Sequence, residues 1–238
     1  MISLSDFHSH ILPGVDDGSQ SLRESLALLR MEAEQGVGTV AATPHFYARR
    51  DTMEHFLARR RKAAEKLREA MARQGGLPAV VLGAEVHYFR GMGHSEAIRE
   101  LALEGTDYVL VEMPMGPWED VMYRELEQIS DNLCLTPIIA HVERYLRPLG
   151  SGKMLKRLAD LPVLVQANGD FFLRKATSGK AMRMLSRGQI QLLGSDCHNL
   201  TGRAPNLGQA AQQIQDRLGP EALEWIHAHQ RLVLPGSP

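Results

Sequence analysis

Apolar segments rich in Val, Ile and Leu alternate with helical segments along most of the chain, and this alternation constrains the fold more than any other feature. Near-continuous apolar strands of this kind are typical of a parallel sheet with both faces buried. Counting the opening segment, seven strands are predicted, in the segments DFHSH, GTVAATPHF, AVVLGAEVHY, DYVLVEM, TPIIAHVE, PVLVQANG and QIQLLGSD. If these strands close into a βα barrel, the active site lies at their carboxyl ends.

Helices are predicted between the strands from apolar residues at helical spacing. The first helix follows a capping-box sequence, Ser21-Leu22-Arg23-Glu24, and Gly36 ends it. Further helices are expected near 52–74, 94–104 and 152–160, from Pro117 onward, and near 173–187. The length of 238 residues suits one α/β barrel or two small domains, and no linker-like stretch divides the chain. Residues 1–238 are therefore expected to form a single domain.

Charge and composition exclude several classes of function. The formal net charge is −1, which gives no electrostatic case for nucleic acid or an anionic membrane as a partner. The opening residues lack the features of a signal peptide, and no apolar stretch is long enough to insert in a membrane. Cys134 and Cys197 are the only cysteines, so no disulfide framework is predicted. A soluble protein of the reducing cytoplasm is expected.

Histidine or carboxylate side chains stand at the end of almost every predicted strand. His8 and His10 are two residues apart on the first strand, so both point to one face. The sixth strand is the exception, because it ends in the neutral residue Asn168. Since all carboxyl ends of a barrel's strands meet at one rim, these side chains are expected to share one pocket. They are His8, His10, His45, Glu85, Glu112, His141, Asp196 and His198.

This set predicts a site for more than one metal ion. Asp16 or Asp17, after the first strand, can add an oxygen ligand; with Asp17 there are five imidazoles and four carboxylates. One transition metal takes four to six donors, so two or three ions that share carboxylates are expected. Nitrogen and oxygen donors without a thiolate favour manganese or iron, with zinc as an alternative. The competing interpretation is a set of polar residues that are hydrogen-bonded separately.

The segment from Cys197 to Arg203 also fits the Cys-x5-Arg signature of thiolate phosphatases. A thiolate mechanism is not favoured, because Asp196 adjoins the cysteine and the segment is not rich in glycine. Cys134 is interpreted as a small packed residue, and Trp118 as a helix-packing residue in preference to a pocket-mouth residue. His87 is assigned equally to pocket lining or surface. The other histidines are expected to be solvated: His55, His94, His227 and His229.

Several motifs occur in an order that resembles a known family: HSH near the start, VDDG, TPH, GAE, HVERY and SDCHNL. The sequence resembles the polymerase-and-histidinol-phosphatase (PHP) superfamily from about residue 6 to residue 208. More narrowly, it is similar to the manganese-dependent bacterial protein-tyrosine phosphatases encoded with capsule and exopolysaccharide genes. The VDDG and HVERY segments separate this branch from histidinol phosphatases.

The resemblance implies a distorted seven-stranded (β/α)7 TIM-like barrel of PHP type that holds three metal ions, manganese first among the candidates. It implies that Glu85 bridges two of the ions, and that Asp17, in place of Asp16, is the ligand of the third. It also implies that Arg144 and Arg203 bind the phosphate. The implied ligand sets are His8, His10, Glu85 and Asp196; then Glu85, Glu112 and His141; then Asp17, His45 and His198.

The expected activity is hydrolysis of phosphotyrosine in proteins by a metal-bridged hydroxide. The resemblance implies a role in capsule or exopolysaccharide synthesis, with a bacterial tyrosine kinase as a partner. Two alternatives stay open. One is a small-molecule phosphomonoesterase, such as a histidinol-phosphate phosphatase; the other is a non-catalytic metal-binding module.

Overall fold

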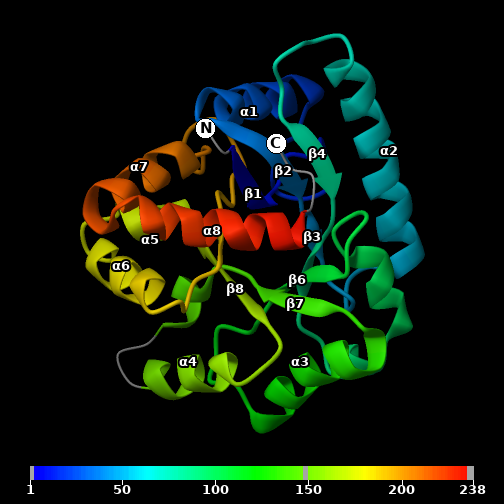
Figure 1. Cartoon of the computed structure of the whole chain (residues 1–238). Helices are drawn as coiled ribbons and strands as arrows, with labels where there is room; N and C mark the ends of the chain where they lie inside the picture. Colours follow the sequence, from blue (N-terminus) through cyan, green and yellow to red (C-terminus); the bar gives the residue numbers. More distant parts are fainter. Residues whose placement is uncertain (1–2, 147–149, 235–238) are drawn as a thin grey trace.

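The computed structural model describes residues 3–146 and 150–234, and it is an α/β fold built on parallel strands (Figure 1). Every strand pairing in this part of the chain is parallel. The strands are β1 (Leu4–Ser9), β2 (Val37–Ala42), β3 (His45–Phe46), β4 (Ala79–Leu82), β5 (Glu85–His87), β6 (Tyr108–Glu112), β7 (Thr136–Ile139), β8 (Leu164–Asn168) and β9 (Leu192–Gly194). The predicted parallel α/β architecture is confirmed.

The strands form two linked sheets, ordered β1-β2-β4 and β3-β5-β6-β7-β8-β9. Two of the seven predicted strands are each split in two, so the described residues contain nine strands. The second breaks at Thr43-Pro44, where proline lacks the N–H that a ladder needs. The third breaks at Gly83, where an added Cβ would lie 2.6 Å from the Leu103 side chain. The strand boundaries therefore differ from the prediction.

The first and last strands meet, so the sheet curls round on itself. Ser9 and Cys197 form a parallel bridge, and the Asp196 amide donates to the His8 carbonyl at 2.7 Å. The His10 amide donates to the Cys197 carbonyl at 2.9 Å. These bonds place the end of β9 beside the end of β1. Residues 188 positions apart in the sequence, such as Ser9 and Cys197, thereby lie at one rim of the sheet.

The helices surround the sheet (Figure 1). They are α1 (Leu22–Glu34), α2 (Met53–Met71), α3 (Asp120–Leu133), α4 (Ser151–Ala159), α5 (Gly169–Leu173), α6 (Ser178–Ser186), α7 (Leu207–Leu218) and α8 (Pro220–Val233), with the 3-10 helices η1 (Met92–His94), η2 (Glu96–Leu101) and η3 (Val142–Tyr145). As predicted, Ser21 caps α1 by accepting from the Glu24 amide. In the described residues, no helix is long and apolar enough to cross a membrane.

Three predicted helices have different boundaries. The helix expected near 94–104 is replaced by η1 and η2, because Ser95 between them has an extended backbone. The helix expected from Pro117 begins at Asp120, since Glu119 is still extended. The segment 173–187 holds the end of α5 and then α6, and α5 starts earlier because Phe171 and Phe172 are buried. Helices α7 and α8 were not predicted.

Apolar side chains from five strands pack together beneath the rim where the polar residues gather. Phe7, Ala41, Leu110, Ile138 and Leu192 form this cluster, and all of them are fully buried. Burial of each Leu, Ile or Phe side chain in it contributes roughly 1.5–3 kcal/mol. This packing fixes the strand positions, and the strand positions in turn determine where the polar strand ends lie.

Candidate metal centre

The nine predicted ligands all converge at one end of the curled sheet. Each stands at, or just beyond, a strand end or at the start of a short strand that continues an earlier one. His45 opens β3 and Glu85 opens β5, directly after the two strand breaks. Groups of these side chains have ligand atoms within 4.8 Å of one another: His10, Asp17, His45 and His198; His8, Glu85 and His141; His8, His10 and Asp196; His45, Glu85 and Glu112.

Glu85 is the centre of the arrangement. Its buried carboxylate lies 2.7 Å from His45 Nδ1 and 2.7 Å from His141 Nε2. His8 Nε2 is 3.3 Å away and His10 Nε2 is 3.5 Å away. One carboxylate is thus in contact with four imidazoles, a position from which it can bridge two ions.

The remaining ligands extend the cluster in two directions. On one side, His141 Nε2 lies 3.7 Å from Glu112 Oε1. On the other side, the mostly exposed Asp17 lies 3.5 Å from His45 Nε2 and 3.6 Å from His198 Nε2. The members of the second and third ligand sets that the resemblance implies therefore lie close to one another.

The ligand atoms of the cluster crowd together in a small buried space. His8 Nε2 and His10 Nε2 lie 3.1 Å apart, at hydrogen-bond distance. His45 Nδ1 and Glu85 Oε2 form an ion pair at 2.7 Å, and His198 Nε2 is buried and makes no hydrogen bond among the described residues. A buried polar atom without a hydrogen bond costs free energy, and a divalent cation held by these atoms would offset that cost.

The buried carboxylates of the cluster require nearby positive charge. Burial alone would raise the pKa of Glu85 and Asp196, but the imidazoles around them, His8 above all, hold both well below the usual range. Burial alone would likewise lower the pKa of His10, and its bond to Asp16 raises the value to about 10 instead. Protonated imidazoles therefore carry the positive charge that the carboxylates require. Bound divalent ions can supply that charge in their place.

Two other imidazoles of the cluster are kept neutral. Burial lowers the pKa of His141. Burial, together with the neighbouring charge of His10, lowers the pKa of His198 to about 4. The neutral form of an imidazole has a free lone pair on one nitrogen, and this is the form that binds a metal.

Asp16 is a supporting residue, as expected from its place beside Asp17. It accepts from His10 Nδ1 at 2.7 Å and from the His45 amide at 2.9 Å. A carboxylate in this position fixes the tautomer and the ring orientation of a ligating histidine. Gly18 permits the tight loop, because a Cβ there would lie 2.2 Å from the His10 carbonyl oxygen.

A second supporting pair, on β8, was not identified from the sequence as part of the site. Gln166 Oε1 accepts from the His141 amide at 2.6 Å, and its Nε2 donates to Asn168 Oδ1 at 2.9 Å. Asn168 Nδ2 then donates to Asp196 Oδ2 at 3.0 Å. The signal was present in the sequence: two amides spaced by two residues lie on one face of a buried strand.

The backbone is unusual at two of the proposed ligands. His141 has a φ of 34° and Asp196 a φ of 53°, both in the left-handed region that residues other than glycine rarely adopt. Such conformations cost of order 1–3 kcal/mol each and cluster at functional sites. Here His141 contacts Glu85, and Asp196 lies against His8 and His10.

The two predicted phosphate-binding arginines lie beside the cluster. Arg144 Nη2 donates to Asp196 Oδ2, and its Nη1 lies 3.9 Å from Glu112 Oε1. Arg203 Nη2 donates to Asp196 Oδ1 at 2.7 Å. Both side chains are partly exposed and line a pocket of about 640 Å³. Cationic groups thus border the proposed metal ligands on the open side.

The structure also resolves the cysteine question. Cys197 is fully buried, and burial raises the pKa of its thiol well above the usual value. It lies in a group with Asp6 and Glu32, away from Asp196 and His198. A buried thiol of high pKa does not suit a thiolate nucleophile, so the rejection of that mechanism is confirmed.

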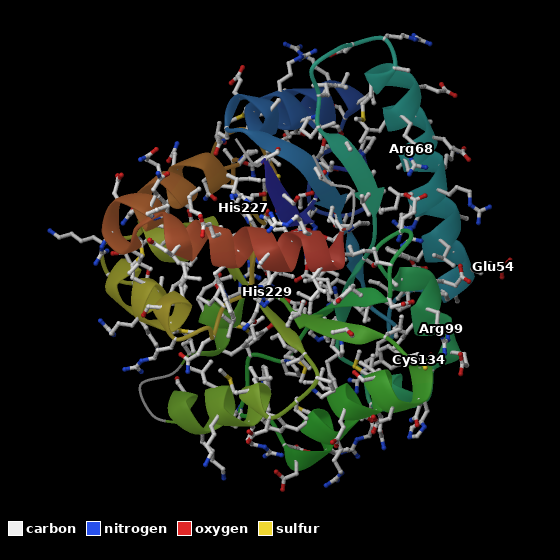
Figure 2. The ribbon with its side chains drawn as sticks, viewed as in Figure 1. Glu54, Arg68, Arg99, Cys134, His227 and His229 are labelled. Carbon is white, nitrogen blue, oxygen red and sulfur yellow. The ribbon has the colours of Figure 1, made fainter. Side chains whose placement is uncertain are left out.

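Two assignments from the sequence were wrong. Cys134 is exposed, because it ends α3 in a left-handed conformation beside Arg99 (Figure 2). His227 of α8 is buried and bonds Gln230, since it lies on the inner face of an amphipathic helix (Figure 2). Trp118 packs against Tyr123 and Tyr145, as expected.

Comparisons with known proteins agree with one another. The family described as "Capsular polysaccharide synthesis, CpsB/CapC" matches residues 4–232. Tyrosine-protein phosphatase CpsB of Streptococcus pneumoniae is 32% identical over 229 residues, which cover 90% of this chain and 90% of that protein. Tyrosine-protein phosphatase YwqE of Bacillus subtilis strain 168 is 27% identical over 236 residues, 96% of this chain and 91% of that protein.

The fold matches a solved structure of this group. That structure comes from work on YwqE and CpsB, described there as unique metal-dependent tyrosine phosphatases. The TM-score is 0.87 at 23% identity, with 99% of this chain and 96% of that chain covered. With a family match over nearly the whole length and a relative above 30% identity, the chain belongs to the CpsB/CapC family of capsular polysaccharide synthesis.

Proposed function

We propose that this protein hydrolyses phosphotyrosine in proteins at a centre of two to three divalent metal ions. The observation that carries the proposal is the convergence of nine imidazole and carboxylate ligands beside two arginines. The names of the relatives, tyrosine-protein phosphatases CpsB and YwqE, support the substrate class. The proposal includes a closed seven-stranded barrel of PHP type and a single domain over residues 1–238.

In the proposal, His8, His10, Glu85 and Asp196 hold the first ion, and Glu85, Glu112 and His141 the second. Asp17, His45 and His198 hold the third. Manganese is favoured because the donors are nitrogen and oxygen without thiolate, and iron and zinc are the alternatives. Bound ions would neutralise phosphate charge and lower the pKa of water toward neutrality.

The protein's own residues orient these groups. Asp16 accepts a hydrogen bond from His10 Nδ1, so that Nε2 is the nitrogen that faces Glu85. The Tyr145 hydroxyl lies 3.3 Å from His141 Nδ1 and also accepts from the Met113 amide at 2.9 Å. His141 Nε2 is thereby directed to Glu85. The ligand atoms are in this way set before any ion binds.

Arg144 and Arg203 bind the phosphoryl oxygens in this proposal. A guanidinium offers a planar fork of N–H donors that matches phosphate geometry, and it keeps its charge at every relevant pH. The leaving group is a phenolate, with a reference pKa of about 10, so strong acid assistance is not required. A phosphorylated protein of capsule synthesis, such as a bacterial tyrosine kinase, is the proposed natural substrate.

The test compares a phosphotyrosine peptide with histidinol phosphate, using wild-type protein loaded with manganese. Glu85→Gln serves as the centre variant, and Glu65→Gln, an exposed glutamate on α2, as its matched control. The proposal predicts a higher kcat/KM for the peptide, loss of turnover in Glu85→Gln, and normal turnover in the control.

Two other results would replace the proposal. A preference for histidinol phosphate would assign a small-molecule phosphatase. No turnover of either substrate, with metals bound, would assign a non-catalytic metal-binding module.

A further inference from the structure

A second pocket, of about 660 Å³, is lined by arginine and aromatic side chains. We call it the arginine–aromatic pocket, and its principal residues are Arg49, Arg50, Arg90, Tyr47, Tyr88 and Phe89. Glu119 is the carboxylate among its lining residues. Three guanidinium groups against one carboxylate give this surface a net positive charge.

The arginines of this pocket are free to bind an anion. Within the described part of the chain, no ion pair includes Arg49 or Arg50. Arg90 lies 3.7 Å from Glu119, and both side chains are about 70% exposed, so that pair is weak. The amides of Arg50 and Asp51 donate to the Tyr47 carbonyl, which holds the two adjacent arginines on a turn. The Arg50 guanidinium lies over the Tyr47 ring, 5.2 Å from its centre.

The pocket is continuous with the candidate metal centre. The Tyr47 ring lies 5.3 Å from both the His45 ring and the His87 ring. His87 Nδ1 is 2.9 Å from Glu112 Oε2, so this lining residue contacts a proposed ligand. Tyr47 and Arg50 also line a smaller pocket with Asp17 and His45. A phosphotyrosine peptide bound at the metal centre can therefore extend over the arginines within a few residues, since an extended chain spans about 3.3 Å per residue.

The pocket beside Arg144 and Arg203 differs in its charge balance. There Arg174 pairs with Asp170, and both Arg144 and Arg203 pair with Asp196. Its four cations, of which Lys180 is the fourth, lie among three carboxylates, Glu143, Asp170 and Asp196. The arginine–aromatic pocket, with three guanidinium groups and one carboxylate, has the larger excess of positive charge.

We infer that the arginine–aromatic pocket binds Asp or Glu side chains of the substrate polypeptide that flank the phosphotyrosine, so that the enzyme prefers acidic substrate sequences. This inference rests on the proposed function and adds a substrate preference to it. Arginine is suited to carboxylates by its planar fork, and the aromatic rings give the peptide an apolar floor.

The test uses two phosphotyrosine peptides that differ only in having Glu or Lys at the positions flanking the phosphotyrosine on each side. Each is assayed with wild-type protein, with the double variant Arg49→Ala/Arg90→Ala, and with a matched control, Arg61→Ala/Arg187→Ala. The control arginines are exposed and lie outside the pocket, and the control removes the same charge.

Wild-type protein is expected to favour the Glu peptide about threefold to tenfold in kcat/KM, the size expected for two exposed ion pairs. The preference should appear in KM, because the pocket binds a part of the substrate that does not react. It should shrink in high salt. The double variant should lose the preference, and the control should keep it.

Equal kcat/KM for the two peptides in wild-type protein would overturn the inference, as would a preference that survives in the double variant. Failure of the proposed function looks different, because no phosphotyrosine substrate is then turned over. Binding of the Glu and Lys peptides, measured by fluorescence anisotropy with the same three proteins, then decides the inference: tighter binding of the Glu peptide, lost in the double variant, supports it, and equal binding refutes it.

Discussion

Arg144→Ala tests whether a cation beside the metal ligands acts on the substrate or only holds the site together. Arg144 bonds Asp196 and lies near Glu112, so a purely structural role is a real alternative. The structure limits how much a structural role of Arg144 can contribute to the free energy of folding. Without Arg144, Asp196 keeps its bonds to Arg203 and Asn168, and the Arg144 side chain is one-third exposed.

The loss of folding free energy is therefore expected to stay near or below about 1 kcal/mol, as for partly exposed ion pairs. The loss of turnover should be much larger. A positioned donor to the charge that develops in the transition state typically contributes a factor of about 10²–10³. We expect Arg144→Ala to lower kcat by that factor on a phosphotyrosine peptide, and Arg144→Lys to recover only part of it, since a point charge cannot make a two-pronged contact.

The assay measures kcat, metal content and melting temperature on the same preparation. Arg68→Ala is the matched control, since Arg68 on α2 also bonds a carboxylate, Glu104 at 2.6 Å, at a surface position (Figure 2). It should leave kcat unchanged. If Arg144→Ala lost its metals or its fold, or if it kept full turnover, the assignment of phosphate binding to Arg144 would be refuted.

Three further predictions concern the residues around the centre. Cys197→Ser should keep most phosphatase activity, because the buried thiol has a raised pKa; trapping a phosphocysteine would contradict this. Burial, then the neighbouring Asp6, raises the pKa of Glu32 well above its usual value, so the folded state binds the proton more tightly than the unfolded state. Stability from this group is full at acid pH and is lost as pH rises above about 5. Glu32→Gln should therefore weaken the fall of melting temperature with rising pH, and an unchanged slope would refute this account. Gly18→Ala should lower metal affinity, measured by titration with manganese, because the new Cβ meets the His10 carbonyl; wild-type affinity would show that the loop adjusts freely.

The candidate ligands could be predicted because strand direction and strand ends are both visible in the sequence. Apolar segments give the direction: Glu112 ends one strand, His141 follows the end of the next, and Glu85 follows the apolar run of β4 just after the break at Gly83. In a parallel sheet those ends meet, so proximity follows without any knowledge of the tertiary structure.

The supporting residues, the backbone conformations and the second pocket could not be predicted, because they depend on contacts between distant segments and on local backbone geometry. Gln166 reaches His141 from a neighbouring strand, and Glu32 of α1 lies against Asp6 of β1. The left-handed conformation of Asp196 follows from the junction between β1 and β9. The arginine–aromatic pocket combines loops after β3 and β5, and loop placement carries little periodic signal.

The metal centre is tested most directly by a manganese titration of metal-free protein, with bound metal measured by elemental analysis and turnover of a phosphotyrosine peptide measured at each point. We expect two to three ions per chain at saturation and turnover that rises from near zero as the sites fill. Full turnover in protein that contains no metal, or saturation without any turnover, would contradict this expectation.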